Sequence, residues 1–241
     1  MKVFLFAHQD DEIFALPYIL NSDKKLFIYL TNGVSKGSTE LKLENRTVEA
    51  RYVFEKHLSQ LNSVAIWWGL ENSVPEGELH KFVNVENLAS IEEVIKDQGV
   101  RVTQILTTTF EGAHQDHDSA AVISRKLASV FLVKTIEIST YPQWFSKFYS
   151  FRVLNPRYPS ESFRLERAKT LQLALRLMAS YKSQRATWIG LGLATLGAYA
   201  FRRYRASSPQ PVRSLSPCFY EFRGRALQSE VIKYLTSNSI K

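Results

Sequence analysis

The sequence predicts an α/β fold: a mostly parallel sheet flanked by helices, with a basic C-terminal extension of helices and loops. The first observation is that short apolar runs alternate with longer segments of helical periodicity through residues 1–140. Such alternation is typical of β-α-β units, whose right-handed crossovers make neighbouring strands parallel. The second is that polar clusters follow several of these runs, where sheets of this kind bind ligands. The third is charge, because residues 1–143 carry a net −5 and residues 144–241 a net +13.

Length and composition narrow the class of protein. The chain has 241 residues, of which 45% are hydrophobic, 22% charged and 12% aromatic. These values exclude a disordered tail, a collagen-like fibre and a disulfide-stapled miniprotein, and they suffice for a full core. Cys218 has no second cysteine to pair with, so a reducing compartment is expected. The apolar run over residues 3–7 is too short for the core of a secretory signal, so we expect a cytoplasmic protein.

The N-terminal part predicts a strand, a helix and a second strand. Residues 3–7 are a short apolar run, typical of a buried strand. Residues 12–20 predict a short helix that ends at the polar Asn21-Ser22-Asp23. Residues 26–30 predict the second strand, because Thr31-Asn32-Gly33 follows them as a turn signal.

The middle of the chain continues the alternation. Residues 40–61 have helical periodicity, and residues 64–68 predict a third strand. Residues 85–97 predict a helix that Gly99 stops. Residues 102–107 are rich in β-branched side chains, which favours a strand. The pattern closes with a helix and a strand, over residues 116–130 and 135–139.

The basic second part of the chain has a different organisation. Residues 141–159 are rich in aromatic side chains and contain three prolines, which predicts a long ordered loop. Residues 160–182 have amphipathic helical periodicity, with Ser160 or Ser162 as the N-cap. Residues 218–234 predict a short strand or turn followed by a helix.

Residues 186–201 form an uncharged apolar run with basic residues on both sides. The run is shorter than the ~20 apolar residues of a membrane-spanning helix, and it contains three glycines. Two interpretations stay open: a helix packed in the core, or a segment on a membrane surface with Trp188, Tyr199 and Phe201 at the interface. The second would make residues 186–205 a membrane contact and the protein peripheral to the membrane.

Two polar clusters follow predicted strands and hold three of the five histidines. They are His8-Gln9-Asp10-Asp11 and His114-Gln115-Asp116-His117. Imidazole and carboxylate ligands with one open position make a catalytic zinc site. Such a metal lowers the pKa of water and polarises a carbonyl oxygen, while a nearby carboxylate acts as general base. Because Asp10 and Asp11 are adjacent in an extended loop, one can bind the metal while the other faces the water.

The two clusters resemble the signatures of one family. Residues 7–12, Ala-His-Gln-Asp-Asp-Glu, resemble the Ala-His-Pro-Asp-Asp-Glu signature of the PIG-L/LmbE-like N-deacetylases, and residues 114–117 resemble their His-Pro-Asp-His signature. The resemblance implies a single Rossmann-like domain over residues 1–241. It also implies a zinc hydrolase that removes the N-acetyl group from an N-acetylglucosamine-type sugar. Weaker matches are Thr31-Asn32-Gly33, Arg46 with Glu49, Pro75-Glu76-Gly77-Glu78-Leu79 and Tyr181-Lys182-Ser183-Gln184.

The resemblance implies roles for nine residues. Three would bind the metal: His8, Asp11 and His117. Three would contact the substrate: Asn32, Arg46 and Glu76. Asp10 would be the general base that activates the metal-bound water for attack on the amide. His114 would stabilise the oxyanion or protonate the leaving amine, with Asp116 orienting it.

The sequence departs from the family pattern at three positions. Gln9 and Gln115 each replace a proline. Neither proline is a ligand, so the chemistry is expected to survive with an amide side chain added to each loop. Glu76 is one methylene longer than the Asp that the family has there.

Other functions fit the same residues. Two histidines and one carboxylate also bind Fe²⁺ and other divalent metals. The sugar could be carried on a nucleotide, a lipid or a glycoside. A metal-dependent amidase or phosphoester hydrolase would use similar machinery, and a non-catalytic protein that binds anionic lipid or nucleic acid would account for the basic charge. The sequence contains no recognisable nucleic-acid-binding motif, so nucleic acid is not an expected partner.

Overall fold

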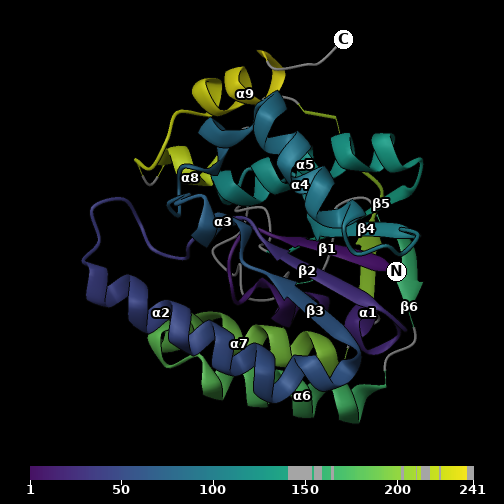
Figure 1. Ribbon diagram of the computed structural model, residues 1–241. Coiled ribbons are helices and arrows are strands. Elements are labelled where there is room, and N and C mark those ends of the chain that lie inside the picture. The colour runs from purple at the N-terminus through teal and green to yellow at the C-terminus, as the bar shows by residue number, and fades with distance from the viewer. Residues whose placement is uncertain are drawn as a thin grey trace.

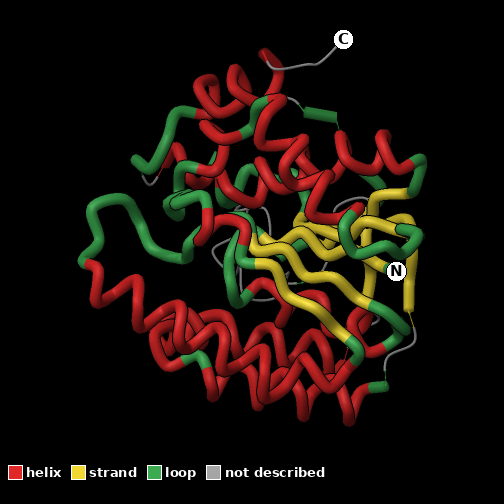
Figure 2. Tube along the Cα trace, viewed as in Figure 1, coloured by secondary structure: helices red, strands yellow, loops and turns green. Residues whose placement is uncertain are grey.

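A mixed sheet with helices on both faces forms the centre of the protein (Figure 1). The computed structural model describes residues 1–140, 154, 159–163, 166–201, 204–209, 211–212, 218–222 and 224–237. Within these ranges the sheet has seven strands in the order β3-β2-β1-β4-β5-β7-β6. Figure 2 shows the strands in the middle of the molecule and the helices on either side of them.

Five parallel strands come from the first part of the chain and two antiparallel strands from the second. The strands are β1 (Lys2–Phe6), β2 (Lys25–Tyr29), β3 (Ser63–Ile66), β4 (Gln104–Thr108), β5 (Lys134–Ile138), β6 (Pro159–Phe163) and β7 (Tyr204–Ser207). β1 pairs in parallel with β2 and β4, β2 with β3, and β4 with β5. β7 pairs antiparallel with β5 and β6. The structure therefore confirms the predicted mostly parallel sheet.

The helices form a layer on each face of the sheet (Figure 1). One layer consists of α1 (Leu16–Leu20), α2 (Glu40–Val53), α6 (Arg167–Ser180) and α7 (Arg185–Phe201). The other consists of α3 (Trp68–Glu71), α4 (Val85–Lys96), α5 (Gln115–Phe131), α8 (Phe219–Phe222) and α9 (Gln228–Ser237). Single-turn helices lie at Asp11–Ala15, Phe54–Leu58, Ser59–Leu61, Leu79–Phe82 and Lys182–Gln184.

Each face of the sheet has its own hydrophobic cluster. On β1, Val3 and Leu5 pack with side chains of the α4, α5 and α9 layer. Phe4 and Phe6 point the other way and pack with the α1, α2, α6 and α7 layer. A parallel strand covered on both faces needs apolar side chains at consecutive positions. This is why an unbroken apolar run marks β1 in the sequence.

The predicted helix over residues 160–182 is wrong at its N-terminal end. Residues 159–163 form the edge strand β6, and the helix begins at Arg167, so neither Ser160 nor Ser162 is its N-cap. Antiparallel pairing with β7 gives this segment its backbone hydrogen bonds. The partner strand lies about 40 residues further along the chain, so helical periodicity within the segment could not reveal the pairing.

Other predicted elements differ in detail. The predicted helix over residues 40–61 is α-helical only to Val53. It continues as a wider π-helical turn over Phe54–Leu58 and a tighter 3-10 turn over Ser59–Leu61. The strand or turn expected at residue 218 is the short helix α8, whereas the helix that follows it is present as α9. The loop predicted over residues 141–159 lies outside the described residues except for Leu154 and Pro159.

The apolar run over residues 186–201 is the helix α7, which packs against α6. Trp188, Ala198 and Tyr199 belong to the buried cluster on that face of the sheet. In the part of the chain that the structure describes, no helix has both the length and the apolar character that crossing a membrane requires. The core interpretation is thus correct for the side of the helix that carries these three residues.

Candidate active site

The two histidine clusters meet at the point where the strand order reverses. The chain builds β1, β2 and β3 in one direction and then returns to place β4 on the other side of β1. The loops that follow β1 and β4 therefore diverge to opposite sides of the sheet, which leaves a crevice at the carboxyl ends of these strands. The first cluster follows β1, and the second forms the N-terminus of α5, which follows β4. Topology alone brings residues about 110 positions apart into contact.

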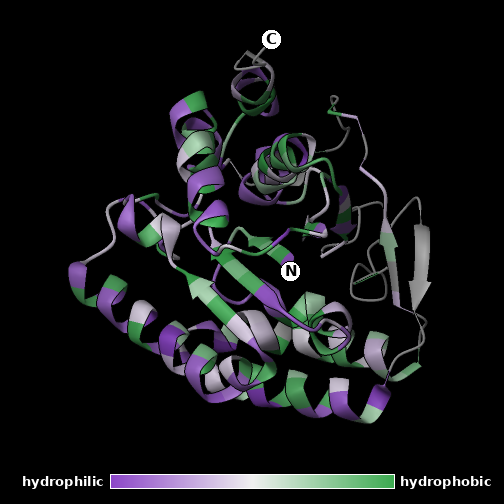
Figure 3. Cartoon of the chain, turned by 45° about the vertical axis from the view of Figure 1, so that its right-hand side comes forward, coloured by the Kyte–Doolittle hydropathy of each residue, from purple (hydrophilic) through white to green (hydrophobic). Residues whose placement is uncertain are grey.

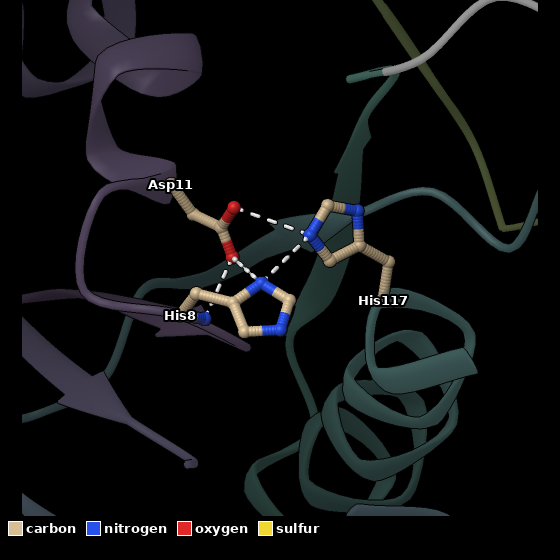
Figure 4. A group of neighbouring side chains, drawn as sticks. All are labelled: His8, Asp11 and His117. Atoms are coloured by element: carbon tan, nitrogen blue, oxygen red, sulfur yellow. Dashed lines mark hydrogen bonds and ion pairs between the residues drawn. The ribbon is translucent and has the colours of Figure 1, made fainter. Parts of the chain in front are cut away.

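His8, Asp11 and His117 point toward one another in this crevice (Figure 4). His117 Nε2 lies 3.1 Å from Asp11 Oδ1 and 3.3 Å from His8 Nδ1. Asp11 Oδ2 lies 3.6 Å from His8 Nδ1 and accepts the His8 backbone N–H at 2.8 Å. All three side chains are buried. The structure thus brings together the three predicted metal ligands.

The charges in this group favour a bound cation. Burial raises the pKa of the Asp11 carboxyl, but His117 and His8 beside it lower that pKa well below its ordinary range. Burial lowers the pKa of His8, yet Asp11 and Asp116 raise it well above its usual value. The group therefore attracts positive charge. Two ring nitrogens and one carboxylate oxygen within 4.8 Å of one another form a donor set that suits zinc and related divalent ions.

Asp10 and Asp11 have different partners, as their adjacency in the loop predicted. The Asp10 carboxylate accepts a hydrogen bond from Arg46 Nη2 at 3.1 Å. Arg46 is buried, and its other terminal nitrogen lies 3.4 Å from Glu49 and 3.2 Å from the Ser183 hydroxyl. The Tyr181 ring lies below the guanidinium at 5.2 Å. An ion pair with Arg46 of α2 therefore holds Asp10 beside the three candidate metal ligands.

Asp116 contacts His8 rather than His114 with its carboxylate. Its Oδ2 lies 3.1 Å from His8 Nε2 and accepts the Gly77 N–H at 2.6 Å. Toward His114 it presents its backbone N–H, which donates to Nδ1 at 3.2 Å. Burial raises the pKa of Asp116, but the hydrogen bond from His8 and the neighbouring His114 bring it to about 2. Asp116 therefore remains ionised and orients both rings by different atoms.

His114 is arranged as a neutral donor. Its Nδ1 accepts the Asp116 backbone N–H, so the ring proton resides on Nε2, which faces Glu76 Oε1 at 4.0 Å. Burial and then the nearby His8 hold the pKa of His114 well below its usual value. A neutral imidazole N–H that points into the site can donate to an oxygen that gains negative charge in the reaction.

The glutamines that replace the family prolines join loops of the site together. Gln9 Nε2 donates to the Thr31 carbonyl at 3.1 Å, and Gln115 Nε2 donates to the Gly77 carbonyl at 3.2 Å. Gly33 suits this position because its φ of +75° strains residues that carry a Cβ, and a Cβ here would also displace the Gln9 amide. The Gln9 amide thus links the signature loop to the loop after β2. The Gln115 amide links α5 to the loop that carries Glu76.

Asn32 and Arg46 have intramolecular partners, whereas Glu76 is more open. Asn32 Oδ1 accepts the Val34 N–H at 3.1 Å, which shapes the turn after β2. The Glu76 side chain retains 31% of its accessible surface beside His114. The contacts of these residues with a substrate stay predictions.

Sequence reasoning gave no role to three residues that hold the site in place. The Tyr181 hydroxyl lies within hydrogen-bond distance of both the Gln9 carbonyl and Glu12 Oε1. Thr140 contacts His117 on the side away from the metal group, and Glu111 contacts Thr140. The Tyr181-Lys182-Ser183-Gln184 match pointed to Tyr181 weakly, but no local pattern marks Thr140, because its partners follow a neighbouring strand.

The histidine and carboxylate group at the switch point of this Rossmann-like sheet is a candidate metal site. Comparison with known proteins specifies the class. The sequence model of PIG-L, described as GlcNAc-PI de-N-acetylase, matches residues 3–128, which is more than half of the chain. The chain therefore belongs to the PIG-L family of deacetylases.

Several solved structures with the same fold are described as deacetylases. One is a deacetylase from the biosynthesis pathway of teicoplanin, with 12% identity, a TM-score of 0.60, and coverage of 85% of this chain and 95% of that one. Another is the zinc-inhibited form of teicoplanin deacetylase, with 12% identity, a TM-score of 0.58, and coverage of 87% and 98%. A third is N,N'-diacetylchitobiose deacetylase from Pyrococcus horikoshii, with 12% identity, a TM-score of 0.56, and coverage of 85% and 80%. No curated protein matches the chain.

Proposed function

We propose that the protein hydrolyses the N-acetyl amide of an N-acetylglucosamine-type sugar and releases acetate and the free amine. The observation that carries this proposal is the convergence of His8, Asp11 and His117 next to Asp10 and His114. It agrees with the family, and the structural neighbours named above are described as deacetylases of the teicoplanin pathway and of N,N'-diacetylchitobiose. The residues predicted from the sequence are the ones that we assign here.

Zinc is the ion that we propose for this group, with Fe²⁺ as the alternative. His8, Asp11 and His117 would hold it, and three protein ligands leave a position open for water or substrate. When bound, the ion supplies Lewis acidity toward water and toward the amide carbonyl.

The remaining steps belong to the side chains around the ligands. Asp10 would take the proton of the attacking water, and the ion pair with Arg46 holds the Asp10 carboxylate in place. The water oxygen adds to the amide carbon, and His114 Nε2–H would donate to the oxygen that becomes negative. As the carbon–nitrogen bond breaks, the amine takes from Asp10 the proton that Asp10 received from the water, and it leaves. Glu76, Asn32 and Arg46 remain our candidates for sugar contacts.

Acetate release tests this function. The purified protein would be incubated with N-acetylglucosamine in free, nucleotide-linked and lipid-linked forms, with and without chelator. We expect chelator-sensitive acetate from one form. Asp10→Asn should reduce the rate by about 10²–10⁴-fold, the range for loss of a general base, while the metal content stays at the wild-type level. Release of phosphate or a larger acid would instead indicate a phosphoester hydrolase or another amidase.

We further propose that the outer face of α7 rests on an anionic membrane surface. Ile189, Leu193 and Phe201 are 78%, 79% and 86% exposed. They lie on the side of the helix away from Trp188 and Tyr199, and α7 carries no acidic residue. Figure 3 shows hydrophobic turns within this helical layer, interspersed with hydrophilic ones. Apolar side chains on the outer face and basic residues around them are typical of interfacial helices.

The basic residues lie in the same layer. Arg167, Lys169 and Arg176 are on α6, and Lys182 and Arg185 are at the corner that leads to α7. Protein on a membrane surface could reach a lipid-linked sugar, so this arrangement favours a lipid carrier over a nucleotide.

Vesicle binding tests the membrane contact. Wild-type protein should sediment with vesicles that contain anionic phospholipid and much less with neutral vesicles. The double substitution Ile189→Ser with Leu193→Ser should abolish sedimentation. Leu132→Ser is the matched control, because Leu132 is equally exposed on the opposite layer. Equal sedimentation of the double variant and the control would contradict the proposal.

A further inference from the structure

A line of hydrogen bonds leads from His117 away from the metal group. His117 Nδ1 lies 2.9 Å from the Thr140 hydroxyl oxygen. The Thr140 hydroxyl donates to Glu111 Oε1 at 3.3 Å, and the same oxygen accepts the Thr140 backbone N–H at 3.1 Å. The second oxygen of Glu111 accepts the Ser139 hydroxyl at 2.7 Å. These contacts join a candidate ligand to a carboxylate that has no part in the proposed chemistry.

The direction of these bonds determines which nitrogen of His117 carries the proton. A threonine hydroxyl has one proton to donate. Because that proton goes to Glu111, the Thr140 oxygen can only accept at its other contact, so His117 Nδ1 must carry the hydrogen. A neutral imidazole has one N–H, so when a metal ion takes the place between Nε2 and Asp11, Nε2 can give it a lone pair. Nε2 is the atom that faces Asp11 and His8 (Figure 4).

The hydrogen bonds from His117 through Thr140 to Glu111 form a relay that the fold holds in place at both ends. His117 and Thr140 are fully buried, so bulk water does not compete for the Nδ1 proton. Thr140 follows β5 and Glu111 follows β4, and these strands pair directly. The Glu111 backbone N–H donates to Asp118 on α5 at 2.9 Å, which ties the loop to the helix that carries His117. The relay therefore forms as a consequence of the strand register.

The other histidine of the group has the opposite arrangement. His8 Nε2 contacts Asp116 directly, so His8 faces the metal group with Nδ1. The two rings thus need different tautomers to present lone pairs to one ion, and each ring has its own carboxylate. The carboxylate that contacts His8 is Asp116. The carboxylate that serves His117 is Glu111, which acts through Thr140.

We propose that Glu111 and Thr140 are positioning residues that hold His117 in the Nδ1–H tautomer and so prepare Nε2 for metal binding. The role of the tautomer rests on the proposed function, because it assumes that His117 is a ligand. Outer hydrogen-bond partners of metal-bound histidines typically change metal affinity by about ten- to hundredfold.

The test compares Thr140→Val, Thr140→Ser and Ser139→Ala with the wild type. In metal-free protein labelled at the histidine nitrogens, two-bond proton–nitrogen spectra report the tautomer of His117. We expect the Nδ1–H form in wild type and Thr140→Ser, and its loss in Thr140→Val. The dissociation constants for Zn²⁺ and Co²⁺ should rise about ten- to hundredfold in Thr140→Val and return toward the wild-type values in Thr140→Ser.

Ser139→Ala is the matched control, because it removes a hydroxyl from the same carboxylate without touching His117. It should leave the tautomer and both dissociation constants close to those of the wild type. An unchanged tautomer and unchanged constants in Thr140→Val would overturn the inference. If the wild type bound neither ion, the proposed function would fail, while the spectra would still decide whether Thr140 sets the tautomer.

Discussion

Arg46 connects groups that come from three distant parts of the chain. One terminal nitrogen pairs with Asp10 on the signature loop, and the other contacts Glu49 on α2 and Ser183 before α7. A guanidinium can serve several acceptors at once because its donors are fixed in a plane. The side chain is almost fully buried, so its first effect is on Asp10. A substrate hydroxyl could reach it only by sharing these donors.

Replacement of Arg46 by lysine should show whether Arg46 acts by holding Asp10 or by contacting the substrate. A lysine ammonium keeps the charge but cannot span Asp10, Glu49 and Ser183 together. We expect kcat to fall by about tenfold to hundredfold, short of the loss of the base itself, while KM changes little. Steady-state acetate release measures both constants. Arg51→Lys, at an exposed position on the same helix, is the control. A higher KM with normal kcat would show that Arg46 contacts the substrate.

Sequence patterns pointed to the candidate site residues but not to the contacts among them. His8, Asp11 and His117 were recognisable because each belongs to a signature with fixed spacing. The sequence could not show that the Asp116 carboxylate pairs with His8. Whether it meets the His8 or the His114 ring depends on side-chain rotation, which residue spacing does not encode. Thr140 and Glu111 reach His117 through pairing of β4 with β5, so their role depends on strand register.

At the scale of elements, three tyrosines from the second part of the chain fasten the turn after β1. Tyr181, Tyr199 and Tyr204 donate their hydroxyls to the carbonyls of Gln9, Ile13 and Phe14. These tyrosines lie next to α6, on α7 and on β7, so the loop that carries Asp10 and Asp11 is held by elements that follow it by about 170 residues. The basic extension predicted from the sequence is therefore part of the site's framework.

Tyr181→Phe should weaken this attachment. The Tyr181 hydroxyl oxygen is also the hydrogen-bond partner of the Glu12 carboxyl, which is completely buried. Burial raises the pKa of Glu12 well above its usual value, and loss of a partner leaves a buried polar group unsatisfied. We expect the free energy of unfolding to fall by about 1–3 kcal/mol, measured by denaturant titration. Tyr52→Phe is the control, since its hydroxyl is exposed; an equal change in both variants would contradict this explanation.

The end of α5 offers a stabilising substitution. Leu132 closes the helix with φ +54°, in the left-handed region, and its side chain is 91% exposed. Residues with a Cβ are strained there, whereas glycine is not. Leu132→Gly should raise the free energy of unfolding by about 0.5–1 kcal/mol. Leu132→Ala keeps the Cβ and should give no such gain. A gain in both would point to removal of the exposed side chain instead.

The central elements could be predicted because the information for them is local. β1, β2 and β4 are apolar runs buried on both faces, and α4 and α5 have clear periodicity and stop signals. β6 could not be recognised, because its hydrogen bonds go to a strand that the chain forms later. The same residues with another partner could continue α6 toward its N-terminus. Non-local pairing therefore overrode the local pattern at the edge of the sheet.

At the scale of the whole molecule, the two halves of the chain differ in what they contribute. The acidic first part supplies the sheet centre and the reactive residues. The basic second part covers one face with α6 and α7 and returns to the other face with α8 and α9 (Figure 1). The mostly parallel sheet was expected from the alternation of strands and helices, whereas the strand order that places the site was not predicted. The return of α9 to the layer of α4 and α5 had no signal in the sequence.

That return buries a histidine whose titration should affect the stability of the entire fold. His80 is 2% exposed, and neither ring nitrogen has a hydrogen-bond partner among the described residues. Its ring meets Tyr234 of α9 edge to face at 5.5 Å. The charged groups that act on it are Asp116, Lys81, Glu230 and Glu78. Burial is the largest influence and lowers the pKa of His80, so the folded protein holds this ring neutral.

The sign of the pH effect follows from this shift. The unfolded chain binds a proton at His80 below pH about 6.5, while the folded protein does not until the pH falls through the lowered pKa. Stability contributed by His80 is therefore complete above pH about 6.5 and is lost on acidification, with a slope of at most about 1.4 kcal/mol per pH unit. Removal of the titrating ring should flatten this part of the stability curve.

His80→Leu is the variant that tests it. The leucine fills a similar volume and removes two unpaired nitrogens, so we expect a gain in the free energy of unfolding that grows as the pH falls from about 8 to about 5. Denaturant titrations at several pH values measure the difference between variant and wild type. Tyr234→Leu, which changes the same contact without a group that titrates in this range, should give a constant difference. Parallel curves for His80→Leu and the wild type would show that His80 accepts a proton equally well in the folded and unfolded protein.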